Sequence, residues 1–170
     1  KNRDSEAVFV VEGEKMMREI LKNWWHYIVL FCTSNEEFLE NNDAFFIDKN
    51  TMKDLSALRT PSDFLLVMRQ PPLQGNTTNL TLAIDGIQDP GNMGTIIRTA
   101  DWFGVDEIVC SKETVDIFNS KVIQSSMGSL FRIPVRYLDL HNYLSDASRP
   151  IYGALLEGGD IYEKKLHAKC

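Results

Sequence analysis

The chain has 170 residues, of which 44% are apolar and 25% charged, and its formal net charge is −6 at pH 7. This length suits one ordinary domain or two small ones, and the apolar content is typical of a globular protein. The acidic balance argues against a surface coated with basic charge for nucleic acid, although a local basic patch stays possible. The longest apolar run, Tyr27 to Cys32, is far shorter than the roughly 20 residues of a membrane span. No signal peptide is visible, so we expect a soluble, cytoplasmic protein with no membrane contact.

The cysteines and histidines are few and scattered along the sequence. Cys32, Cys110 and Cys170 form no CxxC pair, and the first two end strand-like runs. We therefore expect buried, reduced thiols. The three histidines show no ligand spacing, so we expect no metal site.

A segment rich in proline, glycine and polar residues, RQPPLQGNTTN, divides the chain. It predicts a first domain over residues 1–69, a linker over 70–79 and a second domain over 80–170. In the first part we expect strands at 7–13, 27–32, 44–47 and 63–68, and helices at 14–23, 35–42 and 51–58. Thr51 is the expected N-cap of the last of these helices.

The second part alternates strands and helices more regularly. We expect strands at 80–87, 106–111, 133–138 and 150–158, and helices at 89–104, 119–131 and 140–147. Asn119 and Asp139 are the expected caps of the later two helices. This alternation predicts a parallel sheet with right-handed crossovers. Ligands of such sheets bind beyond the carboxyl ends of the strands, where DGIQDPGNMG follows the first strand.

The stretch DPGNMGTIIRTADWFG, residues 89–104, is typical of a tight turn that leads into an amphipathic helix, with Asn92 as a good N-cap. The residues expected to face the core recur at helical spacing: Met93, Ile96, Ile97, Ala100 and Phe103. Arg98 lies outside this stripe and follows Gly94 by one turn. Helical side chains lean toward the N-terminus, so Arg98 is expected to lie back across the glycine.

Two interpretations of Arg98 are open. Its guanidinium and the positive N-terminal end of the helix could converge on an anion such as a phosphate or carboxylate. Alternatively, Arg98 is solvated and pairs with Asp101 three residues later, which is worth a few tenths of a kcal/mol. Asp89 could cap the turn or hold Arg98, and Asn92 fits a cap better than a ligand.

A second candidate segment, SKVIQSSMGSLFRIP, places small residues on an expected helix, among them Ser125, Ser126 and Gly128. The small face could admit a ligand or backbone, or it could serve close helix packing. No GxGxxG, GxSxG, P-loop or paired-carboxylate signature occurs, so dinucleotide binding, serine hydrolysis and NTP hydrolysis lack their usual markers.

Together, DGIQDPGNMGTIIRTADWFGVDEIV and KVIQSSMGSLFRIPV resemble the first signature region of the SpoU (TrmH) family of RNA 2'-O-ribose methyltransferases, within the SPOUT class. The first part of the chain looks like the small ribosomal-protein-like substrate-binding domain that many members carry. The resemblance covers essentially the whole chain. It is specific because Asn92, Gly94, Arg98 and Ala100 fall at the family's spacing.

The resemblance implies an α/β protein in which a small N-terminal α/β domain precedes a parallel-sheet SPOUT-type domain, with a trefoil knot in the complete protein. It implies a homodimer that transfers a methyl group from S-adenosylmethionine to a ribose 2'-hydroxyl of rRNA or tRNA. On this pattern Arg98 is the family's catalytic arginine and Asn92 its motif partner. Other expected substrate contacts are Lys1, Arg3, Lys15, Arg59, Gly94, Ser126 and Gly128.

The chemical role of Arg98 is constrained by its side chain. A ribose hydroxyl must be deprotonated and aligned with the methyl carbon before it attacks. Arginine has a pKa above ~12 and is a poor base at neutral pH, so we favour a clamp on the neighbouring phosphate over a general base. The 2'-hydroxyl also marks the substrate as RNA.

One departure from the family pattern concerns the cofactor. The family's glycine-rich GNExxG loop and its SLNxxxA segment do not occur in this sequence, which starts at Lys1 and ends at Cys170. We therefore expect an incomplete piece of the enzyme, with the cofactor-binding motifs beyond Cys170. The alternative is a non-enzymatic RNA- or ribosome-binding protein that lost its cofactor site. A receiver-like phosphate-binding domain is a third possibility, weakly supported by Asp85 and Asp89.

Overall fold

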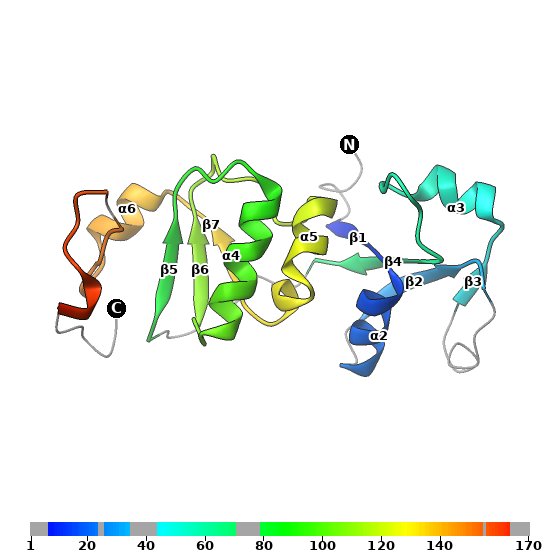
Figure 1. Cartoon of the computed structure of the whole chain (residues 1–170), viewed down its shortest axis with the longest axis horizontal. Coiled ribbons are helices and arrows are strands. Elements are labelled where there is room, and N and C mark those ends of the chain that lie inside the picture. The colour runs from blue at the N-terminus through cyan, green and yellow to red at the C-terminus, as the bar shows by residue number, and fades with distance from the viewer. Residues whose placement is uncertain (1–6, 24–25, 35–43, 71–78, 155, 164–170) are drawn as a thin grey trace.

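The computed structural model describes residues 7–23, 26–34, 44–70, 79–154 and 156–163. These residues form two β-sheets that follow one another along the length of the molecule, with helices packed beside each sheet (Figure 1). The first sheet is built from residues before the expected linker and the second from residues after it. Residues 71–78 of that linker lie outside the described residues, and the domain boundaries stay a prediction.

The first sheet has four strands in the order β1-β4-β2-β3. Strand β4 pairs antiparallel with β1 and β2, whereas β2 and β3 are parallel. Its elements are β1 (Val8–Glu12), α2 (Glu14–Lys22), β2 (Tyr27–Cys32), β3 (Ala44–Phe46), α3 (Lys49–Leu55) and β4 (Phe64–Arg69). Gly13 joins β1 to α2 with φ of 110°, a conformation that suits glycine.

Two predictions for helices in the first part of the chain are not confirmed. The helix expected at 35–42 lies outside the described residues. The expected cap of α3 is wrong: Asp48 is the N-cap, and its carboxylate accepts hydrogen bonds from the backbone N–H groups of Asn50 and Thr51. Both residue types cap helices well, so the choice depends on where the preceding strand lets the helix begin.

The second sheet has three parallel strands in the order β5-β6-β7, which confirms the parallel sheet and the α/β class. Its elements are β5 (Thr81–Ile84), α4 (Pro90–Trp102), β6 (Glu107–Cys110), α5 (Ser120–Ser126), the 3-10 turn η2 (Ser129–Phe131), β7 (Val135–Tyr137) and α6 (Leu140–Ser145), and the 3-10 turn η3 (Ile161–Glu163) follows. All four residues of the central strand β6 are buried. Asn119 and Asp139 cap α5 and α6 as expected.

Two predicted elements differ in the structure. The helix expected at 119–131 ends at Ser126, because Met127 and Gly128 adopt φ of 49° and 89° and turn the chain before η2. The strand expected at 150–158 does not form in the described residues of that range, where Ile151 and Tyr152 are 56% and 44% exposed. An apolar run becomes a strand only where it meets a partner edge, which its own sequence does not supply.

The core continues from one sheet to the other. Helix α5 lies between α4 and β1 (Figure 1), and buried side chains from both sheets form one hydrophobic cluster. At this junction the ring of Phe9 lies 4.8 Å from that of Phe118 and 5.9 Å from that of Phe131. Cys32 and Cys110 are buried and free, as expected. Among the described residues, no helix is both long enough and apolar enough to cross a bilayer.

Candidate functional site

Helix α4 begins at the carboxyl end of the edge strand β5. Asp89 is its N-cap: the carboxylate accepts a hydrogen bond of 2.7 Å from the backbone N–H of Asn92, and Pro90 occupies the first helical position. The prediction that Asn92 caps this helix is therefore wrong. Its side chain is exposed on the first turn and is available for another contact.

Gly94 allows α4 and α5 to approach closely. A Cβ at this position would overlap the Ser125 hydroxyl and lie 2.7 Å from Ser125 Cβ and 2.8 Å from the backbone nitrogen of Ser126. The cleared space beside Gly94 is thus filled by α5, and not by Arg98 or an open ligand site. Of the two interpretations of the small-residue segment, close helix packing is the one observed.

Ser126 also faces the protein interior. It is fully buried, and its hydroxyl donates to the carbonyl of Ile123 over 2.8 Å. Gly94 and Ser126 are both buried where the two helices meet, and direct contact of these residues with substrate stays a prediction. Gly128 is buried too, and its φ of 89° serves the turn between α5 and η2.

Arg98 is exposed on the side of α4 that faces the end of α5. Its Nη1 atom lies 3.4 Å from the sulfur of Met127, the left-handed residue that ends α5. A thioether is a weak acceptor, so this contact orients the guanidinium without neutralising it. In the described part of the chain Arg98 forms no ion pair with a carboxylate.

The predicted pairing of Arg98 with Asp101 is wrong, because Asp101 pairs with Arg132. Arg132 Nε and Nη2 lie 2.9 and 2.7 Å from Asp101 Oδ2, and Arg132 Nη1 lies 3.1 Å from Glu19 Oε1 on α2. Burial acts to raise the pKa of Asp101, but hydrogen bonds from Arg132 and Ser129 and the Arg132 charge lower it below the ordinary aspartate value. Asp101 is therefore ionised at neutral pH.

A hollow of about 440 Å³ lies beyond the carboxyl ends of the three parallel strands. Its lining includes Asp85, Ser111, Lys112, Asp139 and His141, which directly or closely follow those strands. This is the edge at which the strand pattern predicted a ligand. Asn92 is on the first turn of α4 near this edge, but Arg98 is six residues further on, ~9 Å along the axis and on a different face. The structure does not bring the two motif residues together.

Two titratable groups beneath this edge are unsuited to proton transfer. Burial raises the pKa of Cys110, the last residue of β6, to about 12. Burial likewise raises the pKa of Tyr137, whose hydroxyl donates to the carbonyl of Val115. Neither side chain is a base or nucleophile at neutral pH.

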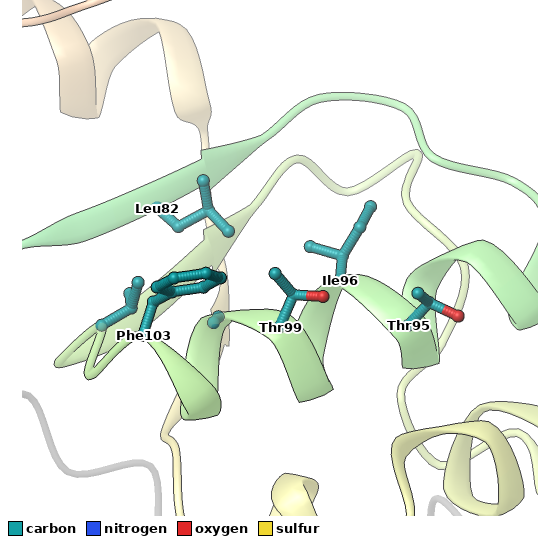
Figure 2. Close-up of a pocket in the computed structure, with 7 residues that line it drawn as sticks. Leu82, Thr95, Ile96, Thr99 and Phe103 are labelled. Atoms are coloured by element: carbon teal, nitrogen blue, oxygen red, sulfur yellow. The ribbon is translucent and has the colours of Figure 1, made fainter.

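An apolar groove of about 230 Å³ lies between α4 and the edge strand β5. Figure 2 shows Leu82 of β5 facing Ile96, Thr99 and Phe103 along one side of α4. Phe103, expected in the core, is 74% exposed here, and the neighbouring Trp102 is 85% exposed. This groove and these rings form an exposed apolar surface on the helix that carries Arg98.

The basic residues expected to contact RNA are partly described. Lys15 lies exposed in the first turn of α2, and Arg59 lies exposed in the loop before β4. Because the end of β1 pairs with the start of β4, both residues flank the same end of the first sheet. Lys1 and Arg3 lie outside the described residues.

Local sequence patterns did not reveal the contact of Met127 with Arg98, or those of Arg132 with Asp101 and Glu19. Arg132 belongs to the motif segment, but its partners come from α4 and from a helix 113 residues away in sequence. Charge spacing reveals pairs only within one helix, so no local signal was present.

Comparison with known proteins identifies the family to which this chain belongs. The model of the SpoU rRNA Methylase family matches residues 79–170, which include α4, α5 and the strands of the second sheet. The chain is 32% identical to the Bacillus subtilis 23S rRNA (guanosine(2553)-2'-O)-methyltransferase RlmP, over 96% of this chain and 69% of RlmP. The chain therefore belongs to the SpoU family of rRNA methylases.

Solved structures give the same assignment. A candidate RNA methyltransferase of the TrmH family from Porphyromonas gingivalis matches 97% of this chain and 69% of its own, with 33% identity and a TM-score of 0.81. An AdoMet-bound rRNA methyltransferase from Sinorhizobium meliloti matches 84% of this chain and 59% of its own, with 27% identity and a TM-score of 0.68. The chain spans 36% of two vertebrate mitochondrial rRNA methyltransferases that it also matches.

Proposed function

We propose that this chain carries the RNA-binding domain and the arginine-bearing part of the catalytic domain of an RNA 2'-O-ribose methyltransferase that uses S-adenosylmethionine and acts on rRNA. The observation that carries the proposal is Arg98. It lies within the segment matched by the SpoU family, exposed, oriented by Met127 and without a carboxylate partner among the described residues. An oriented and uncompensated guanidinium suits a phosphate of the RNA backbone.

Arg98 acts in this proposal by holding the substrate. A planar guanidinium can donate two parallel hydrogen bonds to phosphate oxygens, which fixes the neighbouring ribose in one orientation. Holding the 2'-oxygen in near-attack geometry with the methyl donor lowers the activation free energy of methyl transfer by a large part. Loss of the 2'-hydroxyl proton is assigned to the bound phosphate or to water. Asn92, exposed on the first turn, is the proposed motif partner on the substrate side.

S-adenosylmethionine supplies the methyl group when it is bound. The described residues do not form a complete site for it, because both hollows are open to solvent, whereas a cofactor site buries most of its ligand. The chain spans 69% of the length of RlmP, and residues that would enclose the cofactor are not found around these hollows in the described part of the chain.

The remaining parts of the proposal concern partners and location. Lys15 and Arg59 are proposed to contact RNA phosphates from one end of the first sheet. A homodimer is proposed because Trp102, Phe103 and the apolar groove leave a water-exposed apolar surface on α4. The reduced thiols of Cys32 and Cys110 are consistent with the cytoplasm.

The test is methyl transfer by the full-length protein to rRNA, with radiolabelled S-adenosylmethionine and mapping of the product by alkaline hydrolysis. A 2'-O-methyl group removes the nucleophile that cleaves RNA in alkali, so the modified position is resistant. Label incorporation at one alkali-resistant linkage supports the proposal. RNA binding without incorporation would instead favour the non-enzymatic alternative.

A further inference from the structure

Arg132 joins three separate elements through its guanidinium. It follows η2 directly, donates two hydrogen bonds to Asp101 on α4, and forms an ion pair of 3.1 Å with Glu19 on α2. Nη2 also donates to the hydroxyl of Ser129 over 3.1 Å. All three guanidinium nitrogens of Arg132 thus donate to an acceptor on the protein, which restrains the side chain.

Asp101 is the carboxylate on α4 that Arg98 could reach, because residues three apart lie on one face of a helix. In the structure the Asp101 side chain is 23% exposed and is turned to Arg132, while Arg98 is turned to the sulfur of Met127. The two arginines therefore have separate partners. Among the described residues, Ser129 is the other side chain that hydrogen-bonds to the Asp101 carboxylate, so without Arg132 the Asp101 charge would lack a cationic partner.

We propose that Arg132 is a positioning residue that holds Asp101 away from Arg98 and so keeps the Arg98 guanidinium available to an RNA phosphate. This inference rests on the proposed function of Arg98 as the phosphate-binding group. An Asp101 carboxylate that paired with Arg98 would compete with the phosphate for the same guanidinium N–H donors. Its negative charge would also repel the phosphate. At a separation of about 6 Å and an effective dielectric constant of about 40–80, as suits an exposed site, such repulsion weakens phosphate binding by roughly three- to tenfold.

The same contacts link Asp101 on α4, through Arg132, to helix α2 beside the first sheet. Glu19 contributes the second carboxylate that fixes Arg132, and its Cγ atom lies near Gly128, where a Cβ would be 3.5 Å away. The position of α2, which also carries Lys15, therefore influences how firmly Arg132 holds Asp101. A Glu19→Gln variant is expected to show a weaker form of the Arg132 effect.

The test compares Arg132→Gln, Asp101→Asn and the double variant in the full-length protein, with kcat and KM for rRNA methylation. We expect Arg132→Gln to lower kcat/KM by roughly three- to tenfold, Asp101→Asn to stay within about twofold of the parent, and the double variant to recover the loss. Arg132→Lys should retain most activity, because a point charge still attracts Asp101. If Arg132 only joins η2 to α4, Asp101→Asn will be as harmful as Arg132→Gln and the double variant will not recover, which overturns the inference.

A second readout does not depend on methylation. In protein labelled with 15N-arginine, the Nε–H proton of Arg132 should exchange slowly and that of Arg98 quickly, since Arg132 donates this proton to Asp101 whereas Arg98 contacts the Met127 sulfur through Nη1. In Arg132→Gln the Arg98 proton should become protected, and in the double variant it should not. Unchanged Arg98 exchange in Arg132→Gln would overturn the inference. If the parent lacks methylation while these shifts occur, the proposed function fails and the positioning of Arg98 stands.

Discussion

The close contact of α4 with α5 at Gly94 predicts that the smallest possible substitution, Gly94→Ala, clearly lowers the free energy of unfolding. The added Cβ would overlap the Ser125 hydroxyl and lie 2.7 Å from Ser125 Cβ and 2.8 Å from the backbone nitrogen of Ser126. The hydroxyl can rotate away, but the backbone nitrogen cannot, so the helices must separate. Overpacking of this kind costs about 1–3 kcal/mol, here at the upper end. Alanine returns about 1 kcal/mol through its higher helix propensity. The net expectation is about 2 kcal/mol of destabilisation.

The assay is chemical or thermal denaturation followed by circular dichroism. A loss of this size lowers Tm by about 4–8 °C for a chain of this length. Gly91→Ala on the same helix is the comparison variant, since its Cβ would meet the side chains of Asp89 and Lys121, at 3.1 and 3.8 Å, and no backbone atom of α5, so the two helices need not separate and this variant should be more stable than Gly94→Ala by at least ~1 kcal/mol. Adding Ser125→Gly to Gly94→Ala should restore part of the loss. A Gly94→Ala protein as stable as the parent would refute the packing role.

Three further predictions concern the cap, the RNA surface and the cofactor. Asp89→Ala should cost about 1 kcal/mol in denaturation experiments through loss of the α4 cap, whereas Asn92→Ala should change stability by less than half as much; equal losses would contradict the assignment of the cap. Replacing Lys15 and Arg59 by alanine should weaken RNA binding and reduce the slope of log K against log salt by ~0.7–0.9 for each lost phosphate contact, and an unchanged slope would reject these contacts. In calorimetric titration the 170-residue chain should bind S-adenosylhomocysteine far more weakly than the full-length protein, and micromolar binding by the chain would mean that the described residues hold the cofactor.

The sequence patterns predicted helix α4 well because its segment combines an apolar period with capping residues. Helix α4 was predicted over 89–104 and runs from Pro90 to Trp102. The capping residue was misassigned since Asp89 and Asn92 have similar intrinsic preference, and the start of the helix decides between them. The strand expected at 150–158 failed for a different reason: strand formation depends on a neighbouring edge that periodicity cannot reveal.

The candidate site was predicted in part. Arg98 could be singled out because it departs from the core stripe, but its surroundings could not. Gly94 was expected to leave space for Arg98, and that space is filled by Ser125 of a helix 31 residues later. Phe103 fits the apolar period, yet it caps the end of α4 beside the open edge strand β5 and is 74% exposed. Contacts that depend on how two helices meet are set by tertiary packing, which local spacing does not encode.

The central claim, that Arg98 holds the RNA phosphate for methyl transfer, is tested most directly by methylation kinetics of Arg98→Ala and Arg98→Lys in the full-length protein. S-adenosylhomocysteine binding and thermal stability are measured on the same samples. Both variants should fold and bind S-adenosylhomocysteine like the parent while methylation of rRNA falls by more than about a hundredfold, with lysine unable to replace the planar fork. Turnover close to the parent value in Arg98→Ala would contradict the account.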